Sequence, residues 1–315
     1  MSELQPFRLE PYFRTRIWGF NDLAPWYEYK TEGEPIGEVW LTGEMCKVAT
    51  GPLAGLTLTE ITQKLGRGLL GSAYGTGEFP LLIKLLFPKE KLSVQVHPDD
   101  AMAQKYGEPR GKTECWYALD AKPGAAVALG IRPGISTEQI RTAIENSTLE
   151  ELLQMVPVYK GDMLFVDAGT VHAMGPGVVI LETQQTSDRT YRMYDYGRPR
   201  ELHIDKSLEA MRVKTKAGKI SPHAENGHTI LLDEKYFKIE KWEIAGPDGE
   251  GGLANHNGTV QMFFVIDGAI RISSEGGERF SVGRCELAVV PADAKGVRIE
   301  SETSASVIRI YPNAV

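Results

Sequence analysis

The sequence predicts a mainly β fold with a small helical insertion. Most of the chain consists of short runs of strand-forming residues that end at turn pairs such as Asp267-Gly268, which is typical of antiparallel sheets. Two capping boxes, which mark helix starts, lie close together within residues 136–150. We therefore expect sheets to form the body of the protein, and residues of about 134–154 to be a helical insertion.

Size and composition restrict the class of protein. The 315 residues are enough for two domains, and the net charge of −7 argues against general nucleic-acid binding, which depends on a basic surface. The N-terminus lacks a basic segment followed by an apolar run, and no stretch approaches the ~20 apolar residues of a membrane helix. The cysteines Cys46, Cys115 and Cys285 are scattered and odd in number. These features predict a cytoplasmic protein without nucleic-acid or membrane partners.

The N-terminal part predicts strands around one helix. Thr57 with Glu60 forms a capping box, and the apolar residues that follow fall on one helical face before Gly66. A run at residues 79–87 is apolar apart from Lys84, which suits a strand buried on both sides. Further strands are expected at residues 36–41 and 46–49.

Residues 92–117 contain the first group of candidate ligands. Residues 92–97 alternate apolar and polar, which places Gln95 and His97 on the polar face of a strand. After a short helix predicted at residues 99–106, a second alternating run places Lys112 and Glu114 on one face. If the two strands pair antiparallel, these four side chains share one pocket. Imidazole and carboxylate are ligand types that zinc accepts.

A third ligand follows in residues 161–172, which read GDMLFVDAGTVH and place His172 after a mostly apolar strand and a turn. His97, Glu114 and His172 would suit a catalytic zinc, which keeps one coordination position open. Gln95 could be a fourth ligand through its amide oxygen, although amide ligation of zinc is unusual.

The two capping boxes and the second half of the chain complete the expected fold. Ser136 with Gln139 and Ser147 with Glu150 would start two helices of the insertion. A long meander is predicted at residues 178–196, a helix at 205–212 and a polar linker at 213–235. Short strands are then expected at residues 237–244, 260–266, 270–273, 287–290 and 307–311. The strand that ends at Pro291 leads into Ala-Asp-Ala-Lys without a histidine, so no metal site is expected there.

The motifs resemble those of one family. The first metal motif resembles the first motif of cupin β-barrels, with Gln95 in place of the leading histidine, and the second resembles the second cupin motif, with Asp167 where a proline often stands. QVHPDD, GKTECWY and DAGTVHAMGPGVVILETQQTSDRTYRMYD, together with RIWG and IGEVW, resemble type I mannose-6-phosphate isomerases. The resemblance implies a cupin-type β-barrel (jelly-roll) catalytic domain over residues 1–235, and a second, degenerate cupin-like barrel over 236–315.

The resemblance also implies an activity, which is the zinc-dependent interconversion of mannose 6-phosphate and fructose 6-phosphate through a cis-enediolate. It implies one Zn²⁺ per chain on Gln95, His97, Glu114 and His172. Lys112 matches a lysine implicated in acid/base work or substrate binding. Arg192 matches an arginine, treated as catalytic, that follows a Ser-Asp pair. We interpret it as stabilising the enediolate, because a guanidinium stays protonated.

Several assignments stay open at the sequence level. Lys91, Ser93, Arg198 and Arg200 all compete as ligands of the substrate phosphate, and His203 is either a second acid/base group or structural. The alternatives to the isomerase are an iron-dependent cupin dioxygenase and a non-catalytic sugar-binding protein. The sequence does not specify the oligomeric state, and we expect a monomer or a weak homo-oligomer that binds a small sugar phosphate.

Overall fold

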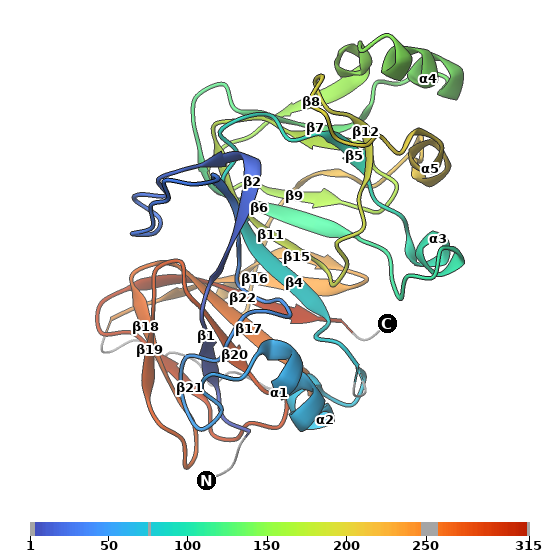
Figure 1. The fold of residues 1–315 in the computed structure, drawn as a ribbon. Helices are drawn as coiled ribbons and strands as arrows, with labels where there is room; N and C mark the ends of the chain where they lie inside the picture. Colours follow the sequence, from blue (N-terminus) through green and yellow to red (C-terminus); the bar gives the residue numbers. More distant parts are fainter. Residues whose placement is uncertain (1–3, 75–76, 247–257, 314–315) are drawn as a thin grey trace.

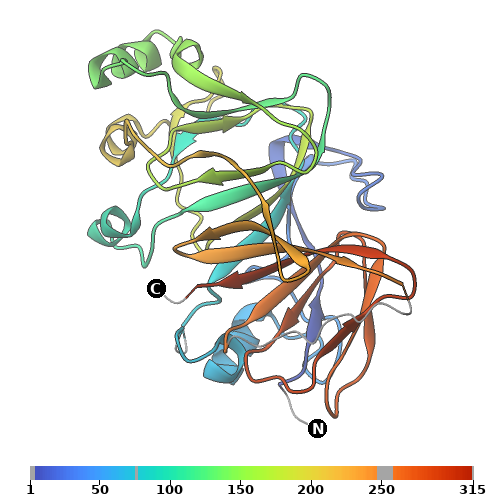
Figure 2. The ribbon, with the colours of Figure 1, turned by 180° about the vertical axis from the view of Figure 1, so that it is seen from behind.

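The computed structural model of the protein describes residues 4–74, 77–246 and 258–313. Strands dominate it, which confirms the mainly β prediction (Figure 1). They form four sheets that pack face to face, and Figure 2 shows from behind that the C-terminal strands, in orange and red, lie below the sheets formed by the middle of the chain.

The first pair of sheets encloses a core of alternating side chains. Trp116, Leu164 and Ile180 come from one sheet, and Leu129 and Met174 come from the other. The five-stranded sheet has the order β12 (Tyr191–Tyr194), β5 (Val94–Val96), β10 (His172–Met174), β7 (Ala126–Ile131) and β8 (Leu153–Pro157). The seven-stranded sheet has the order β13 (Gly218–Ile220), β9 (Met163–Val166), β6 (Glu114–Ala121), β11 (Val178–Gln185), β4 (Leu81–Leu86), β3 (Ile36–Trp40) and β2 (Tyr12–Phe20).

A second pair of sheets encloses a separate core that includes Phe263, Ile272 and Val307. Its larger sheet has the order β1 (Phe7–Leu9), β20 (Leu287–Val290), β17 (Gln261–Asp267), β22 (Ala305–Pro312), β16 (Phe237–Ile244), β15 (His228–Glu234) and β14 (His223–Glu225). The smaller sheet has the order β19 (Phe280–Gly283), β18 (Ala269–Ser273) and β21 (Arg298–Glu300). Strand β1 thus joins the C-terminal sheet, and the division of the chain at residue 235 stays a prediction.

The two seven-stranded sheets pack against each other through their outer faces. Because side chains alternate along a strand, β6 directs Trp116 into the first core and Tyr117 into the contact between the sheets. Tyr117 and Phe165 there join the same cluster as Phe264 and Ile308 of the C-terminal sheet. This apolar contact fixes the position of β6, which carries candidate site residues.

Helices cover the outer face of the five-stranded sheet and lie along one side of the molecule (Figure 1). These are α3 (Asp100–Lys105), α4 (Thr137–Glu145), the 3₁₀ turn η1 (Leu149–Leu152) and α5 (Ile204–Ala210), whereas α1 (Leu58–Leu65) and α2 (Arg67–Leu70) lie near the C-terminal sheet. None of the helices in the described parts of the chain is long and apolar enough to cross a membrane.

The helix starts follow the sequence in two cases out of three. The predicted capping boxes of Thr57 with Glu60 and of Ser136 with Gln139 are both present. The third is wrong, because Ser147 adopts a left-handed conformation with φ of 59°. Thr148 is instead the residue that precedes η1, and its side chain makes no capping hydrogen bond.

Two stretches differ from their predicted structure. Residues 213–235, expected as a linker, contain β13, β14 and β15, because the buried run at Ile230, Leu231 and Leu232 completes the C-terminal sheet. Residues 46–49, expected as a strand, form only isolated bridges, one from Lys47 and one from Val48. Both stretches are too mixed in polarity for periodicity to reveal their pairing partners.

Candidate active site

The candidate ligands come from both sheets of the first pair and meet between them. The expected antiparallel pairing of residues 92–97 with 112–117 is wrong, because β5 and β6 belong to different sheets. Pro98 and helix α3 carry the chain from one sheet to the facing one. Gln95 pairs instead with His172 of β10 on one side and with Arg192 of β12 on the other. The polar faces of both sheets nevertheless point at the same interior point.

Three buried side chains form a compact cluster at this point. The candidate metal-binding atoms of His97, Glu114 and His172 all lie within 4.8 Å of one another. Nε2 of His97 lies 3.4 Å from Oε2 of Glu114, and Nε2 of His172 lies 3.4 Å from Oε1. It is the one such group of three histidine, cysteine or acidic residues found within the described ranges.

The hydrogen bonds of the two histidines fix which nitrogen faces Glu114. Nδ1 of His97 lies 2.9 Å from the carbonyl oxygen of Arg189, and Nδ1 of His172 lies 2.9 Å from that of Thr170. A carbonyl can only accept, so each Nδ1 carries the proton and each Nε2 presents a lone pair. Burial holds the pKa of His97 well below its usual value and lowers the pKa of His172 to about 4, so both rings are neutral near pH 7.

The cluster contains more hydrogen-bond acceptors than donors. Neither oxygen of Glu114 accepts a hydrogen bond from a described residue, although Nζ of Lys112 forms an ion pair with Oε2 at 3.0 Å. The same Nζ lies 2.9 Å from Nε2 of His97. Lys112 balances one side of this group, but Oε1 of Glu114 still faces Nε2 of His172 in a buried space with no cation of the described residues beside it, and a further cation would stabilise that side. Two histidines and one carboxylate also suit a catalytic zinc that keeps an open position. The residues therefore fit a bound divalent metal.

Gln95 lies at the edge of this cluster. Its Nε2 is 3.2 Å from Nε2 of His172, and its Oε1 is 3.3 Å from Oγ of Ser93. Amide oxygen and nitrogen are assigned from the hydrogen-bond network, so a flipped amide would bring the oxygen to the histidine side. The position is therefore compatible with a fourth ligand.

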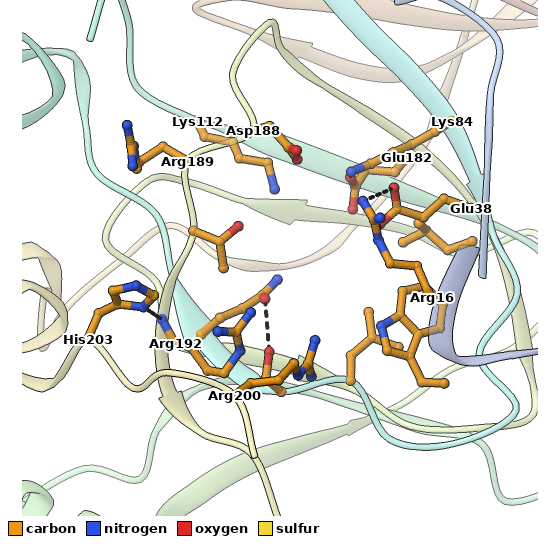
Figure 3. A pocket seen from close by; sticks show the side chains of 16 residues that line it. Arg16, Glu38, Lys84, Lys112, Glu182, Asp188, Arg189, Arg192, Arg200 and His203 are labelled. Carbon is orange, nitrogen blue, oxygen red and sulfur yellow. Dashed lines mark hydrogen bonds and ion pairs between the residues drawn. The ribbon is translucent and has the colours of Figure 1, made fainter. Parts of the chain in front are cut away.

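A cavity of about 440 Å³ lies beside the cluster, and Figure 3 shows the side chains that line it. Gln95 and Lys112 contact the cluster and also line the cavity, so the candidate metal site lies directly behind its wall. Six cationic side chains line the cavity, against three carboxylates. The cationic ones are Arg16, Lys84, Lys112, Arg189, Arg192 and Arg200. This balance favours an anionic ligand.

Arg192 lines the cavity without an ion pair to a carboxylate of the described residues. Its NH1 donates to the carbonyl oxygen of Glu201 at 2.8 Å, while its Nε is buried without a hydrogen-bond partner in the described structure. Its backbone N–H donates to Nδ1 of His203 at 3.1 Å, which orients that ring at the cavity wall (Figure 3). Burial and nearby Arg200 lower the pKa of Arg192, but a guanidinium remains protonated at neutral pH.

Two ion pairs that line the cavity, one buried and one partly buried, were not predicted from the sequence. Nζ of Lys84 lies 2.9 Å from Oε1 of Glu182, and Arg16 makes two hydrogen bonds to Glu38, at 2.9 and 3.0 Å. Burial alone would raise the pKa of Glu38, but Lys84 and Arg16 lower it to about 2. Lys84 could have indicated such a pair, because it is the single charged residue in an apolar strand and a buried charge needs a partner.

Comparisons with known proteins point to one family. Residues 6–135 match the model of the family "Phosphomannose isomerase type I, catalytic domain". The mannose-6-phosphate isomerase ManA of Bacillus subtilis is 38% identical over 257 residues, which covers 77% of this chain and 80% of the relative. The chain belongs to the type I phosphomannose isomerase family.

Other members of this family show the same relation. The mannose-6-phosphate isomerase of Streptococcus mutans is 36% identical over 255 residues, covering 77% of this chain and 80% of that one. The crystal structure of a mannose 6-phosphate isomerase from Bacillus subtilis superposes with a TM-score of 0.85 at 34% identity, covering 97% of this chain and 99% of the other. The matches therefore extend well beyond residue 135, over both pairs of sheets.

Proposed function

We propose that this protein is a zinc-dependent aldose–ketose isomerase that interconverts mannose 6-phosphate and fructose 6-phosphate. The observation that carries the proposal is the buried cluster of His97, Glu114 and His172 behind a cationic cavity, in a chain of this family. A sugar phosphate is anionic, and the cavity lining is cationic.

His97, Glu114 and His172 would hold the metal, with the amide oxygen of Gln95 as a fourth ligand. A bound zinc supplies Lewis acidity, which polarises the oxygens on C1 and C2 of the open-chain sugar. Lys112 lies between the cluster and the cavity. As a neutral amine, which it would become once the metal engages Glu114, it would take the proton from C2 and return it to C1. The hydroxyl proton on O2 passes to O1, so the reaction needs no external oxidant. A placed proton-transfer group contributes roughly 10²–10⁴ in rate.

Arg192 stabilises the charge that develops on the enediolate oxygens. Its guanidinium lines the cavity and forms no ion pair with a carboxylate of the described residues, so it can donate to an anion without first breaking one. His203 lines the same wall and accepts from the backbone of Arg192. We therefore assign His203 the role of holding the Arg192 segment in place.

The phosphate group would bind to Arg200 and Ser93. Both line the cavity, whereas Lys91 and Arg198 do not. Arg198 donates to the carbonyl oxygen of Lys91 and to Asp195, and Lys91 pairs with Glu150. Arg200 is held by Asp195 through Nε and NH2, at 2.6 and 2.7 Å, and thus presents a fixed guanidinium to the cavity.

We expect Arg200→Met to raise KM for mannose 6-phosphate about 10- to 100-fold while kcat changes by only a few-fold, because a charge-assisted hydrogen bond to the phosphate contributes ~1.5–3 kcal/mol. Steady-state kinetics on mannose 6-phosphate measure both constants. Arg198→Met is the matched control, because it removes the other partner of Asp195 from outside the cavity. Equal KM values for the two variants would contradict the assignment of Arg200.

The proposed function is tested by stripping the metal with a chelator and then reloading it. We expect isomerisation of mannose 6-phosphate to disappear in the stripped protein and to return with Zn²⁺. Full activity of stripped protein would refute the metal dependence, and absence of isomerisation in the reloaded protein would refute the reaction.

The same donor set binds iron readily, so a dioxygenase is the second candidate. The cationic cavity lining favours proton chemistry on an anionic substrate over oxygen activation. An oxygen electrode distinguishes the two reactions, since the isomerase consumes no oxygen.

We also propose a cytoplasmic location, which the three free and buried cysteines support.

A further inference from the structure

Asp100 connects three separate segments of the chain although it does not line the cavity. Its Oδ1 accepts the backbone N–H of Gly111 at 2.9 Å and the side-chain amide of Gln185 at 3.0 Å. Its Oδ2 accepts the hydroxyl of Tyr236 at 2.6 Å, and Nζ of Lys235 lies 3.9 Å away. The first two groups flank the candidate site, and the tyrosine belongs to the turn between β15 and β16 of the C-terminal sheet.

The segment that follows Gly111 carries both Lys112 and Glu114. Its backbone N–H groups are anchored one after another: Gly111 to Asp100, Lys112 to the carbonyl oxygen of Pro98 at 3.0 Å, and Thr113 to Oε1 of Gln185 at 2.9 Å. The carboxylate of Glu114 accepts no hydrogen bond from a described residue. Its one ion pair in the described structure is with Lys112 of the same segment, so the position of the carboxylate depends on the backbone that carries both residues.

Gln185 and Gly111 make this anchoring tight. Gln185 accepts from Thr113 through its side chain and donates its backbone N–H to the carbonyl oxygen of Thr113 at 3.1 Å. A Cβ at Gly111 would lie 2.5 Å from the backbone carbon of Asp99. The segment thus packs directly against the start of α3, where Asp100 holds it, and only glycine fits.

We propose that Asp100 is a positioning residue that ties the β15–β16 turn, through Tyr236, to the backbone of Lys112 and Glu114. The C-terminal sheet would then influence the metal site without contributing a ligand. The role of the metal rests on the proposed function, but the contacts of Asp100 do not.

The test uses the full chain with the variants Asp100→Asn, Asp100→Ala and Tyr236→Phe. Outer contacts that orient metal ligands typically change metal affinity or activity 10- to 100-fold. We expect both Asp100 variants to weaken Zn²⁺ binding about 10- to 100-fold in chelator competition. We also expect them to lower kcat for mannose 6-phosphate while KM stays within about 3-fold. Tyr236→Phe should show a smaller loss of the same kind.

Two measurements separate positioning from general stability. Hydrogen exchange of the amides of residues 111–114 should be faster in metal-free Asp100→Asn than in metal-free wild type. In a double-mutant cycle, Tyr236→Phe should add little to Asp100→Ala, because the hydroxyl acts through the carboxylate. If the Asp100 variants fail to fold, Tyr236→Phe, which removes a single hydroxyl, still provides the test.

Matched controls come from exposed residues. Asp205→Asn makes the same change in the first turn of α5, where Arg141 is the one partner of the carboxylate among the described residues. Tyr106→Phe removes a hydroxyl that donates to exposed Glu209. Both should leave Zn²⁺ affinity, kcat and amide exchange as in wild type.

A lower melting temperature in the Asp100 variants, with unchanged Zn²⁺ affinity, kcat and exchange at residues 111–114, would overturn the proposal. A wild-type chain that binds no Zn²⁺ would also overturn it. If wild type binds Zn²⁺ but does not isomerise mannose 6-phosphate, the proposed function fails, while weaker Zn²⁺ binding by the variants would still support Asp100.

Discussion

His172→Ala is expected to lose its bound metal and its isomerase activity together, and His97→Ala should behave in the same way. Each variant removes one of three ligand groups that lie within 4.8 Å of one another. Lewis-acid stabilisation by a bound metal is worth several kcal/mol, so we expect kcat to fall about 10³-fold or more. Metal content by elemental analysis and isomerisation of mannose 6-phosphate, measured on the same sample, provide the check.

His223→Ala is the control. The side chain of His223 is 64% exposed, its nearest charged partner is Glu225 at 3.9 Å, and it does not line the cavity. It should retain full metal content and full activity. A His97 or His172 variant that contains no metal and isomerises mannose 6-phosphate at the wild-type rate would contradict the metal assignment. Melting curves on the same samples show whether loss of metal accompanies loss of the fold.

The sequence was sufficient to predict which side chains point inward, but not which strands pair. Alternation placed His97 and Glu114 on polar faces, and both are buried in the same cluster. Alternation could not reveal that β5 and β6 lie in opposite sheets, because a two-residue period shows which side chains share a face of a strand but not which strand pairs with it. The pairing of Gln95 with His172 is a long-range contact that only the complete sheet specifies.

Lys84 and Glu182 illustrate a second limit. Lys84 stands alone in an apolar strand, Glu182 ends the apolar run of β11, and the strands β4 and β11 pair so that the two residues are direct neighbours. A lone charge in an apolar run predicts that a partner exists, but its identity depends on strand register. The predicted linker failed for a related reason, since β15 is buried only after the C-terminal sheet has formed around it.

Arg192→Ala is expected to lower kcat strongly and to leave metal content unchanged. If the guanidinium stabilises charge that appears only on the enediolate, its removal should affect the transition state far more than substrate binding. The loss of one charge-stabilising donor corresponds to ~10²–10³ in kcat. Arg192→Lys should recover only part of this, because lysine offers a point charge instead of a planar fork.

The structure narrows the competing explanations for this arginine. One alternative role is a purely structural ion pair, for instance with Asp188 or Asp195. No carboxylate lies within 4 Å of the Arg192 guanidinium across the described residues, and Asp195 is held by Arg198 and Arg200 instead. A phosphate ligand remains as the rival, and it predicts a steep rise in KM together with weaker inhibition by free phosphate.

Measuring kcat, KM and melting temperature on Arg192→Ala therefore decides between the two roles. Arg141→Ala is the control, because Arg141 is partly exposed and pairs with Asp205. Arg200→Met provides the opposite pattern if it holds the phosphate, a raised KM with little change in kcat. Two arginines that line one cavity would then show separable kinetic effects. An unchanged kcat in Arg192→Ala would remove this residue from the chemical step and leave Lys112 and the metal ligands to account for it.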